Sequence, residues 1–224
     1  MEGKVPLAFT ETKRKYKDIE FKPGTILRFP TAWQVKDLTL TTGVIFLLYL
    51  FAYFLVFAGI TPLQERVMPE ITQFASLLFL PHGIRVLGTS LLGIRAVPGL
   101  VLAELTGNYL FWGMTQPDTL LFSAMISGSI TWIVFEGLRT LRVNAFYLQL
   151  SEQAPAFHAL LLAGLLASAA NAFLLTSLIE GNMGVGHVTM LIAAYMTGDI
   201  TGLFAVLLTV RYLMPAVTRL FGNP

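Results

Sequence analysis

The chain contains no cysteine, and only 12% of its 224 residues are charged. Without cysteine it has no disulfide, no haem-attachment motif and no thiolate metal site. The charged share is about half of the roughly 25% that is usual in soluble domains. Hydrophobic residues make up 55% of the chain, and the mean hydropathy is +0.69. Apolar runs long enough to cross a bilayer recur along the sequence, which predicts a polytopic membrane protein.

Familiar catalytic motifs are missing as well. The sequence holds no H-E-x-x-H, G-x-S-x-G, Walker or dinucleotide-binding pattern. The three histidines, His82, His158 and His187, are expected at three different membrane depths, so they cannot share a metal. We therefore expect a protein that is not an enzyme and that has no metal site, no cofactor and no nucleic-acid partner.

The apolar runs predict an all-α bundle of six transmembrane helices. Each run has about 19–25 residues, the length that a hydrocarbon core of roughly 30 Å requires at 1.5 Å per residue. The expected spans are Leu38–Ile60, Ile71–Ile94, Ala96–Met114, Thr119–Leu138, Ala156–Ile179 and Val188–Val210. They give a cytoplasmic and interfacial segment over residues 1–37, a membrane domain over 38–217 and a short cytoplasmic tail over 218–224.

The distribution of basic residues predicts the orientation. Residues 1–37 carry eight of the 15 lysines and arginines, which places the N-terminus in the cytoplasm. Counting crossings from there puts five more basic residues on the same side: Arg95, Arg139, Arg142, Arg211 and Arg219. We expect a bacterial inner-membrane protein with both termini inside and an interfacial segment near residues 22–36. The basic tail is read as a lipid-facing segment, or else as a docking site for a cytoplasmic partner.

Four ionisable residues fall well inside the predicted spans: His82, Arg85, Glu104 and Asp199, whereas Glu136 and His158 lie near the inner ends of theirs. An ionised group at the bilayer centre costs about 2.5–3.5 kcal/mol, so such groups face protein or water. Depths counted from the outer span ends differ by roughly 6 Å among Arg85, Glu104 and Asp199, a gap that an arginine side chain can bridge. We therefore expect Arg85 to pair with Glu104 or Asp199. The cluster is either a structural clamp joining three spans or a polar pocket that binds a small ligand or a proton. Glu136 is expected to pair with Arg139, three residues on.

Proline and small residues are expected to shape the bundle. Pro81 should kink or break the second span, with Gly83 weakening the helix further. Such a break is tolerated at membrane depth where the freed backbone groups line protein or a cavity. Glycine- and alanine-rich faces in the third and fifth spans should let helices approach closely. Asn108 and Asn171 are expected to form hydrogen bonds between helices.

Several segments together resemble the MASE-type membrane-associated sensor domains. They are "FLPHGIRVLG" at 79–88, the turn "GIRAVPG" at 93–99, "EGLRTLRV" at 136–143 and "TGDITG" at 197–202. The segments occur in the family's order and extend over about residues 74–217. Carried over by position, the resemblance points to seven residues: Pro81, Gly83, Pro98, Gly99, Gly198, Asp199 and Gly202. His82 and Arg85 depart from the family pattern.

The resemblance implies a six-span sensor that acts through another protein. Members of this family usually precede a cytoplasmic cyclase, phosphodiesterase or kinase, whereas this chain ends shortly after its last span. The expected partner is therefore a separate signalling protein or a larger membrane complex in which the chain is an accessory subunit or scaffold. The alternative is the substrate-binding subunit of an energy-coupling-factor type transporter, whose six spans and spaced glycines this chain also resembles.

Overall fold

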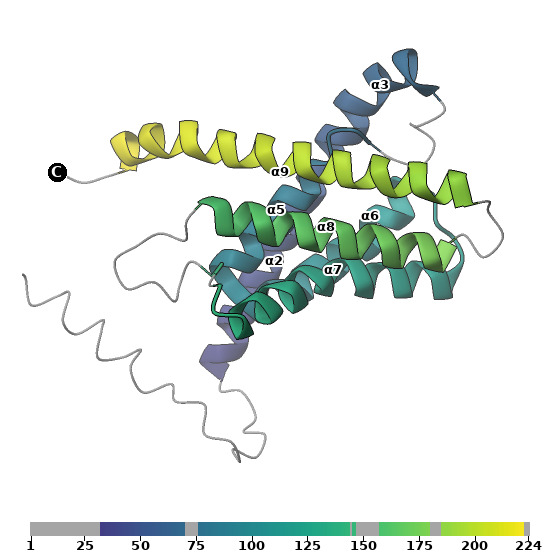
Figure 1. Ribbon diagram of the computed structural model, residues 1–224. Coiled ribbons are helices and arrows are strands. Elements are labelled where there is room, and N and C mark those ends of the chain that lie inside the picture. Colours follow the sequence, from purple (N-terminus) through teal and green to yellow (C-terminus); the bar gives the residue numbers. More distant parts are fainter. Residues whose placement is uncertain (1–31, 70–75, 144, 147–156, 180–184, 222–224) are drawn as a thin grey trace, which may run out of the picture. The chain divides into compact units, whose positions relative to one another are not determined.

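The computed structural model describes residues 32–69, 76–143, 145–146, 157–179 and 185–221 (Figure 1). All regular secondary structure within these ranges is helical. The chain divides into a unit Met1–Lys36 and a unit Asp37–Pro224, and the second carries all that follows. Most of the predicted interfacial segment at 22–36 and of the tail lies outside the described residues.

Five stretches of helix are long and apolar enough to cross a membrane. They are Lys36–Val67, Leu80–Leu110, Pro117–Thr140, His158–Leu178 and Val188–Leu213. The expectation of an all-helical, multi-pass membrane protein is therefore confirmed. Six separate spans are not, because the single stretch Leu80–Leu110 covers parts of both the predicted second span and the predicted third span.

The first stretch contains a change of helix type. Helix α2, Ala32–Leu55, continues through the π-helical turn η1, Val56–Ile60, into the short helix α3, Thr61–Val67. The N–H of Thr61 donates to the carbonyl of Val56, five residues back. Pro62 follows directly, and because its ring would crowd the carbonyl four residues earlier, the wider turn relieves a clash that a regular helix would contain.

The second stretch folds back on itself. It consists of α5, Leu80–Leu92, the 3₁₀ turn η2, Gly93–Ala96, and α6, Val97–Leu110. Gly93 has φ 58° and ψ −136°, a conformation open to glycine and costly for other residues. Arg85 before the turn contacts Glu104 after it, so the two helices form a hairpin. With 13 and 14 residues they are about 20 Å long, shorter than a hydrocarbon core of roughly 30 Å.

The kink expected at Pro81 is not confirmed. Helix α5 begins at Leu80, so Pro81 occupies its first turn, where the missing N–H has no intrahelical partner to lose. Residues 76–79 before it are not helical, and residues 70–75 lie outside the described ranges. Pro98 likewise stands in the first turn of α6. Both prolines therefore begin helices.

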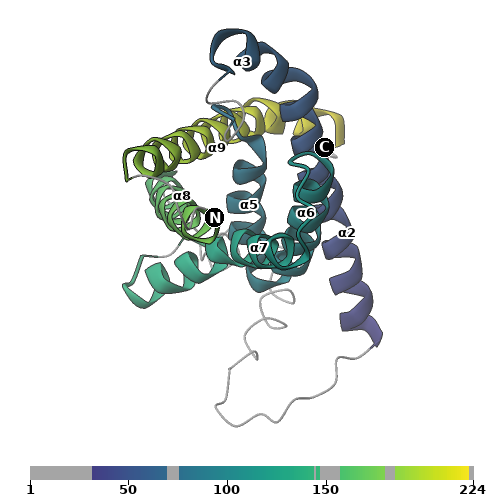
Figure 2. The ribbon, with the colours of Figure 1, turned by 90° about the vertical axis from the view of Figure 1, so that its right-hand side faces the viewer.

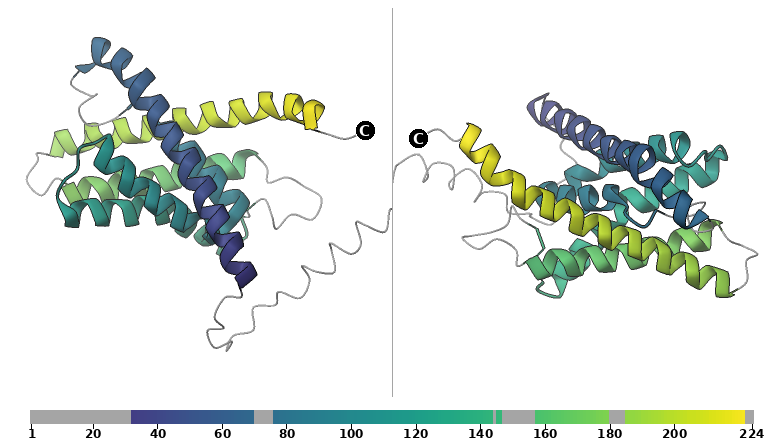
Figure 3. Two further views of the ribbon diagram at one scale, coloured as in Figure 1. Left: turned by 180° about the vertical axis from the view of Figure 1, so that it is seen from behind. Right: turned by 90° about the horizontal axis from the view of Figure 1, so that it is seen from above.

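The remaining helices surround α5. They are α7, Pro117–Thr140, α8, Phe157–Ile179, and α9, Val185–Phe221. Helix α5 packs against α7, α8 and α9, while α6 lies along α7 (Figure 2). Helix α2 crosses the others obliquely on the side of α6 (Figure 3). At 37 residues α9 is about 55 Å long, which exceeds the thickness of a bilayer.

Two glycines of α9 hold the non-helical segment 76–79 in place. The N–H of Phe79 donates to the carbonyl of Gly198 at 2.8 Å. A Cβ added at Gly198 would lie 1.9 Å from the carbonyl oxygen of Ser76, and one at Gly202 would lie 2.0 Å from that of Phe79. Only residues without a side chain allow this approach, which is the close packing of a G-x-x-x-G pair.

Candidate functional site

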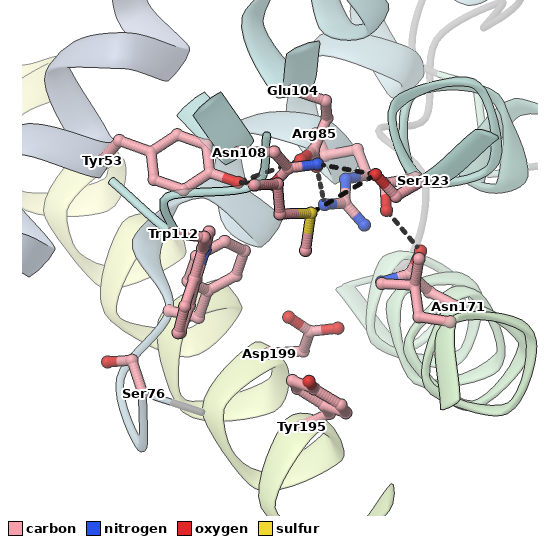
Figure 4. A pocket seen from close by; sticks show the side chains of 14 residues that line it. Tyr53, Ser76, Arg85, Glu104, Asn108, Trp112, Ser123, Asn171, Tyr195 and Asp199 are labelled. Carbon is pink, nitrogen blue, oxygen red and sulfur yellow. Dashed lines mark hydrogen bonds and ion pairs between the residues drawn. The ribbon is translucent and has the colours of Figure 1, made fainter. Parts of the chain in front are cut away.

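A cavity of about 210 Å³ lies inside the bundle (Figure 4). We call it the interior cavity. Its walls come from α2, the segment before α5, the α5–α6 hairpin, α7, α8 and α9. The lining residues are Tyr53, Ser76, Phe79, Arg85, Glu104, Asn108, Trp112, Met114, Ser123, Ser127, Asn171, Leu175, Tyr195 and Asp199. Three of them are ionisable acids or bases in an otherwise apolar protein, so the cavity is the first candidate for a binding site.

Arg85 and Glu104 form an ion pair at one side of the cavity. The guanidinium Nη2 of Arg85 contacts the Glu104 carboxylate and also donates to the hydroxyl of Tyr49 at 2.7 Å. Tyr49 and Tyr53 each donate their O–H to Glu104, Tyr53 at 2.9 Å. Arg85 is 1% exposed and Glu104 2%. The Nη1 atom of Arg85 has no hydrogen-bond partner among the described residues.

Tyr49 and Tyr53 also belong to the site, although neither was predicted from the sequence. They are four residues apart on α2 and therefore project from one face of the helix. The ring of Tyr53 fits against α6 because position 107 is glycine: an added Cβ would lie 2.4 Å from its Cε2 atom. The i, i+4 tyrosine spacing was a usable signal, but tyrosine is also common at membrane interfaces, where it needs no partner.

His82 and Asp199 form the second pair of the site. The His82 Nδ1 atom lies 3.4 Å from Oδ2 of Asp199, and its Nε2 atom lies 3.1 Å from the carbonyl oxygen of Gly164. His82 is fully buried and Asp199 is 4% exposed. Gly164 lies close to α9, since an added Cβ would lie 2.3 Å from the tip of the Leu203 side chain, which would have to shift. The pair links α5, α8 and α9.

Neutral polar side chains complete the walls. Asn108 donates to Ser123 at 3.1 Å, and Ser127 donates to Asn171 at 2.9 Å. The predicted hydrogen bonds of both asparagines between helices are therefore confirmed. Glu136 pairs with Arg139 at 3.3 Å, also as expected, and this pair is partly exposed and separate from the cavity.

The structure brings all four predicted cluster residues together, in two pairs. Arg85 meets Glu104, while Asp199 has His82 as its near neighbour. The family-motif positions lie nearby but contribute packing: Pro81 and Pro98 begin α5 and α6, and Gly83 faces Val206 of α9. Gly99 packs on α2, where an added Cβ would lie 2.8 Å from the carbonyl oxygen of Thr42. Among the described residues no group of three His, Asp or Glu side chains could hold a metal ion.

Fold and site together define an all-helical, multi-pass membrane protein with an ionisable cavity inside its helix bundle. Comparison with family models, curated proteins and solved structures gives no match. The resemblance to the MASE-type sensor domains therefore stays a prediction from the sequence segments.

Proposed function

We propose that this protein is a membrane-embedded sensor module of the MASE type, which binds a small polar ligand in the interior cavity and acts through a separate partner protein. The supporting observation is the cavity itself, with Arg85, Glu104 and Asp199 in its wall. A structural clamp needs only paired charges. It does not need an adjoining space of about 210 Å³.

The arrangement of the helices supports a sensing role. Asp199 is on α9, whereas Arg85 and Glu104 are on the α5–α6 hairpin, so a ligand between them would contact both parts. A ligand that binds one relative position of α9 and the hairpin more tightly than another shifts the population toward that position. In this proposal the partner protein contacts the cytoplasmic side of the bundle and responds to the helix arrangement that the ligand stabilises. The protein has no catalytic step of its own.

The proposed topology is six crossings with both termini in the cytoplasm of a bacterial cell. In this topology the predicted second and third spans, of which α5 and α6 are the helical parts, cross as a hairpin whose η2 turn faces inside. Two contacts at that turn support it: Arg95 pairs with Asp37 near the start of the first stretch at 3.0 Å, and Ser90 donates to the carbonyl of Ala145, just after α7, at 2.8 Å. The partner is then a membrane protein or a cytoplasmic signalling protein.

The second candidate is the substrate-binding subunit of a transporter. The same cavity favours it, because a substrate site inside the bundle needs the same polar walls and a similar volume. A scaffold subunit in a larger complex is the third possibility, and in that role the cavity would bind no ligand.

A pull-down with matched variants tests the sensor proposal. Leu175→Phe puts a larger side chain into the cavity wall, and Leu178→Phe places the same side chain on the exposed face of the same helix. Tagged chains are extracted from native membranes in mild detergent, and co-purifying proteins are identified and quantified. We expect a stoichiometric kinase, cyclase or other signalling protein, whose recovery changes with Leu175→Phe but not with Leu178→Phe.

Three other results would contradict the sensor proposal. A co-purifying ATPase module establishes the transport candidate. A stoichiometric partner whose recovery is the same for both variants indicates a scaffold. Recovery of the intact chain without any partner contradicts both the sensor and the scaffold.

A further inference from the structure

We infer that the ligand of the interior cavity is a small organic ammonium ion, bound at Asp199 in exchange for a proton that Asp199 shares with His82. The inference rests on the ligand-binding function proposed above and names the ligand class and its coupling. The inference has three supports: the contacts of His82, the charges in the cavity wall, and the aromatic lining.

The contacts of His82 leave its Nδ1 atom facing Oδ2 of Asp199, and neither atom has a hydrogen-bond partner among the described residues. A carbonyl oxygen only accepts hydrogen bonds, so the Nε2 atom that lies 3.1 Å from the Gly164 oxygen carries a hydrogen. In the neutral ring Nδ1 is then an acceptor, and it faces the Oδ2 acceptor of Asp199 at 3.4 Å. Two buried acceptors that face each other without a partner are costly, and a proton held by either the imidazole or the carboxyl group removes this cost.

The charges of the cavity wall determine the net charge that the site would have after loss of this proton. Arg85 and Glu104 compensate each other, and their other close neighbours are the phenols of Tyr49 and Tyr53. Tyr195 also lines the cavity, and its phenol is uncharged near neutral pH. Asp199 is therefore the remaining charge: with the shared proton the site is neutral, and without it the site carries one uncompensated negative charge inside the membrane. A ligand with one positive charge restores neutrality.

The lining favours an organic cation over a metal ion. Four aromatic side chains line the cavity: Tyr53, Phe79, Trp112 and Tyr195. Aromatic faces attract ammonium groups and also bury the apolar part of such a ligand. Figure 4 shows Asp199 between Trp112 and Tyr195, with Arg85 across the space. A cavity of roughly 150 Å³ accommodates benzene, so about 210 Å³ accommodates a benzene ring with a short side chain.

The exchange balances in charge and in atoms. One ammonium ion enters from water, and one proton leaves the Asp199–His82 pair for water. No covalent bond other than that to the proton changes. Binding should therefore tighten as the pH rises through the range in which the empty site loses its proton, by up to tenfold per pH unit, because each bound cation displaces one proton.

Calorimetry on the unmodified full chain tests the ligand class and the exchange together. The probes are 2-phenylethylamine hydrochloride and 2-phenylethanol, which share the ring and chain and differ in ammonium against hydroxyl. Each is titrated into the purified protein in detergent, in phosphate and in MOPS buffers of equal pH. The two buffers differ in ionisation enthalpy, so the difference in heat gives the number of protons released. We expect the amine to bind at least tenfold more tightly than the alcohol and to release about one proton.

Each alternative result contradicts one part of the inference. Equal affinity for the alcohol, or no amine binding at millimolar concentration, overturns the ammonium assignment. Amine binding with the same heat in both buffers overturns the proton exchange. The pull-down with Leu175→Phe is independent of both probes, so it tests the sensor function even when the ligand class is wrong.

Variants locate the site. Asp199→Asn should abolish the preference for the amine and the proton release, while Asp118→Asn, at the exposed start of α7, should change neither. The His82→Gln variant should bind the amine with less proton release, and an unchanged release would show that His82 does not share the proton.

Tryptophan fluorescence tests whether the amine enters the interior cavity. In a chain with Trp33→Phe and Trp132→Phe, Trp112 is the remaining tryptophan. Its emission should change with the amine, and no change would exclude the interior cavity.

Discussion

Arg85 is nearly fully buried, and its charge is balanced by one carboxylate and oriented by one phenol. Removing either member of such a pair leaves an uncompensated charge, which typically costs about 3–5 kcal/mol. The pairing itself can be weaker than that cost suggests, because both groups gave up hydration to form it. Removing one partner is therefore expected to lower the stability of the protein more than removing both.

A double-mutant cycle should show this coupling. We expect Arg85→Gln and Glu104→Gln each to lower the free energy of unfolding strongly, and the double variant to lose at least about 1 kcal/mol less than their sum. The measurement is reversible unfolding in mixed micelles. Arg139→Gln with Glu136→Gln is the matched control, and because that pair is half exposed its coupling should stay within about 0.5 kcal/mol. Additivity at Arg85 and Glu104 would contradict the pairing.

Arg142 shows strain of a different kind, in the backbone. Its φ of 64° is left-handed, and the N–H of Val143 donates to the carbonyl of Leu138 at 2.9 Å, which closes α7 with a Schellman motif. Glycine is the residue that this position favours. We expect Arg142→Gly to raise the free energy of unfolding by up to about 1 kcal/mol.

The control for that substitution is Arg139→Gly within α7, which should destabilise the protein by about 1 kcal/mol. Destabilisation by Arg142→Gly in the same unfolding assay would show that the Arg142 side chain contributes more than the strain costs. Comparing the two variants separates the effect of the helix cap on stability from the effect of losing an arginine side chain.

At the scale of elements, the contact between α9 and residues 76–79 governs where α5 begins. We expect Gly202→Ala to lower the free energy of unfolding by more than about 2 kcal/mol, because its Cβ would meet backbone atoms that cannot move independently. Gly137→Ala is the control, since nothing lies within 4 Å of a Cβ at that exposed position of α7. It should be neutral or stabilise by about 0.5–1 kcal/mol. Equal effects would show that segment 76–79 does not pack closely on α9.

The sequence predicted most helices because hydrophobic length alone determines them. It predicted the four cluster residues because a charged side chain in an apolar run is conspicuous whatever its neighbours are. The beginning of α5 was not predictable in the same way. Pro81 is compatible with a kink or a helix start, and the choice depends on the carbonyl of Gly198, more than 100 residues away, which accepts the N–H of Phe79.

The partners within the cluster were also beyond sequence reasoning. Depth estimates allowed Arg85 to pair with either acid, and only the hairpin at Gly93 brings Glu104 into contact while Asp199 stays beside His82. Tyr49 and Tyr53 were missed because a tyrosine in a span has no charge that requires a partner. Their role follows from Gly107 on another helix, which is a property of the packed bundle.

For the whole molecule, the proposed topology makes a sharp prediction for cysteine labelling. In a chain without native cysteine, Asp118→Cys at the start of α7 should react with an impermeant maleimide on intact cells. Thr140→Cys at the end of α7 should react only after permeabilisation. A single crossing by the whole stretch Leu80–Leu110 would reverse both results, so the two positions together distinguish a hairpin from one long span.

The length of α9 has a mechanical consequence. Phe221 is 22 residues beyond Asp199 in one helix, a lever arm of about 33 Å. A tilt of about 5° around Asp199 therefore displaces the far end by about 3 Å, although the movement at the carboxylate stays small. Spin labels at Thr140→Cys and Phe221→Cys should report such a displacement when 2-phenylethylamine is added, and an unchanged distance would exclude leverage by α9. The helix would thus convert the exchange of one cation for one proton into a movement large enough for another protein to detect.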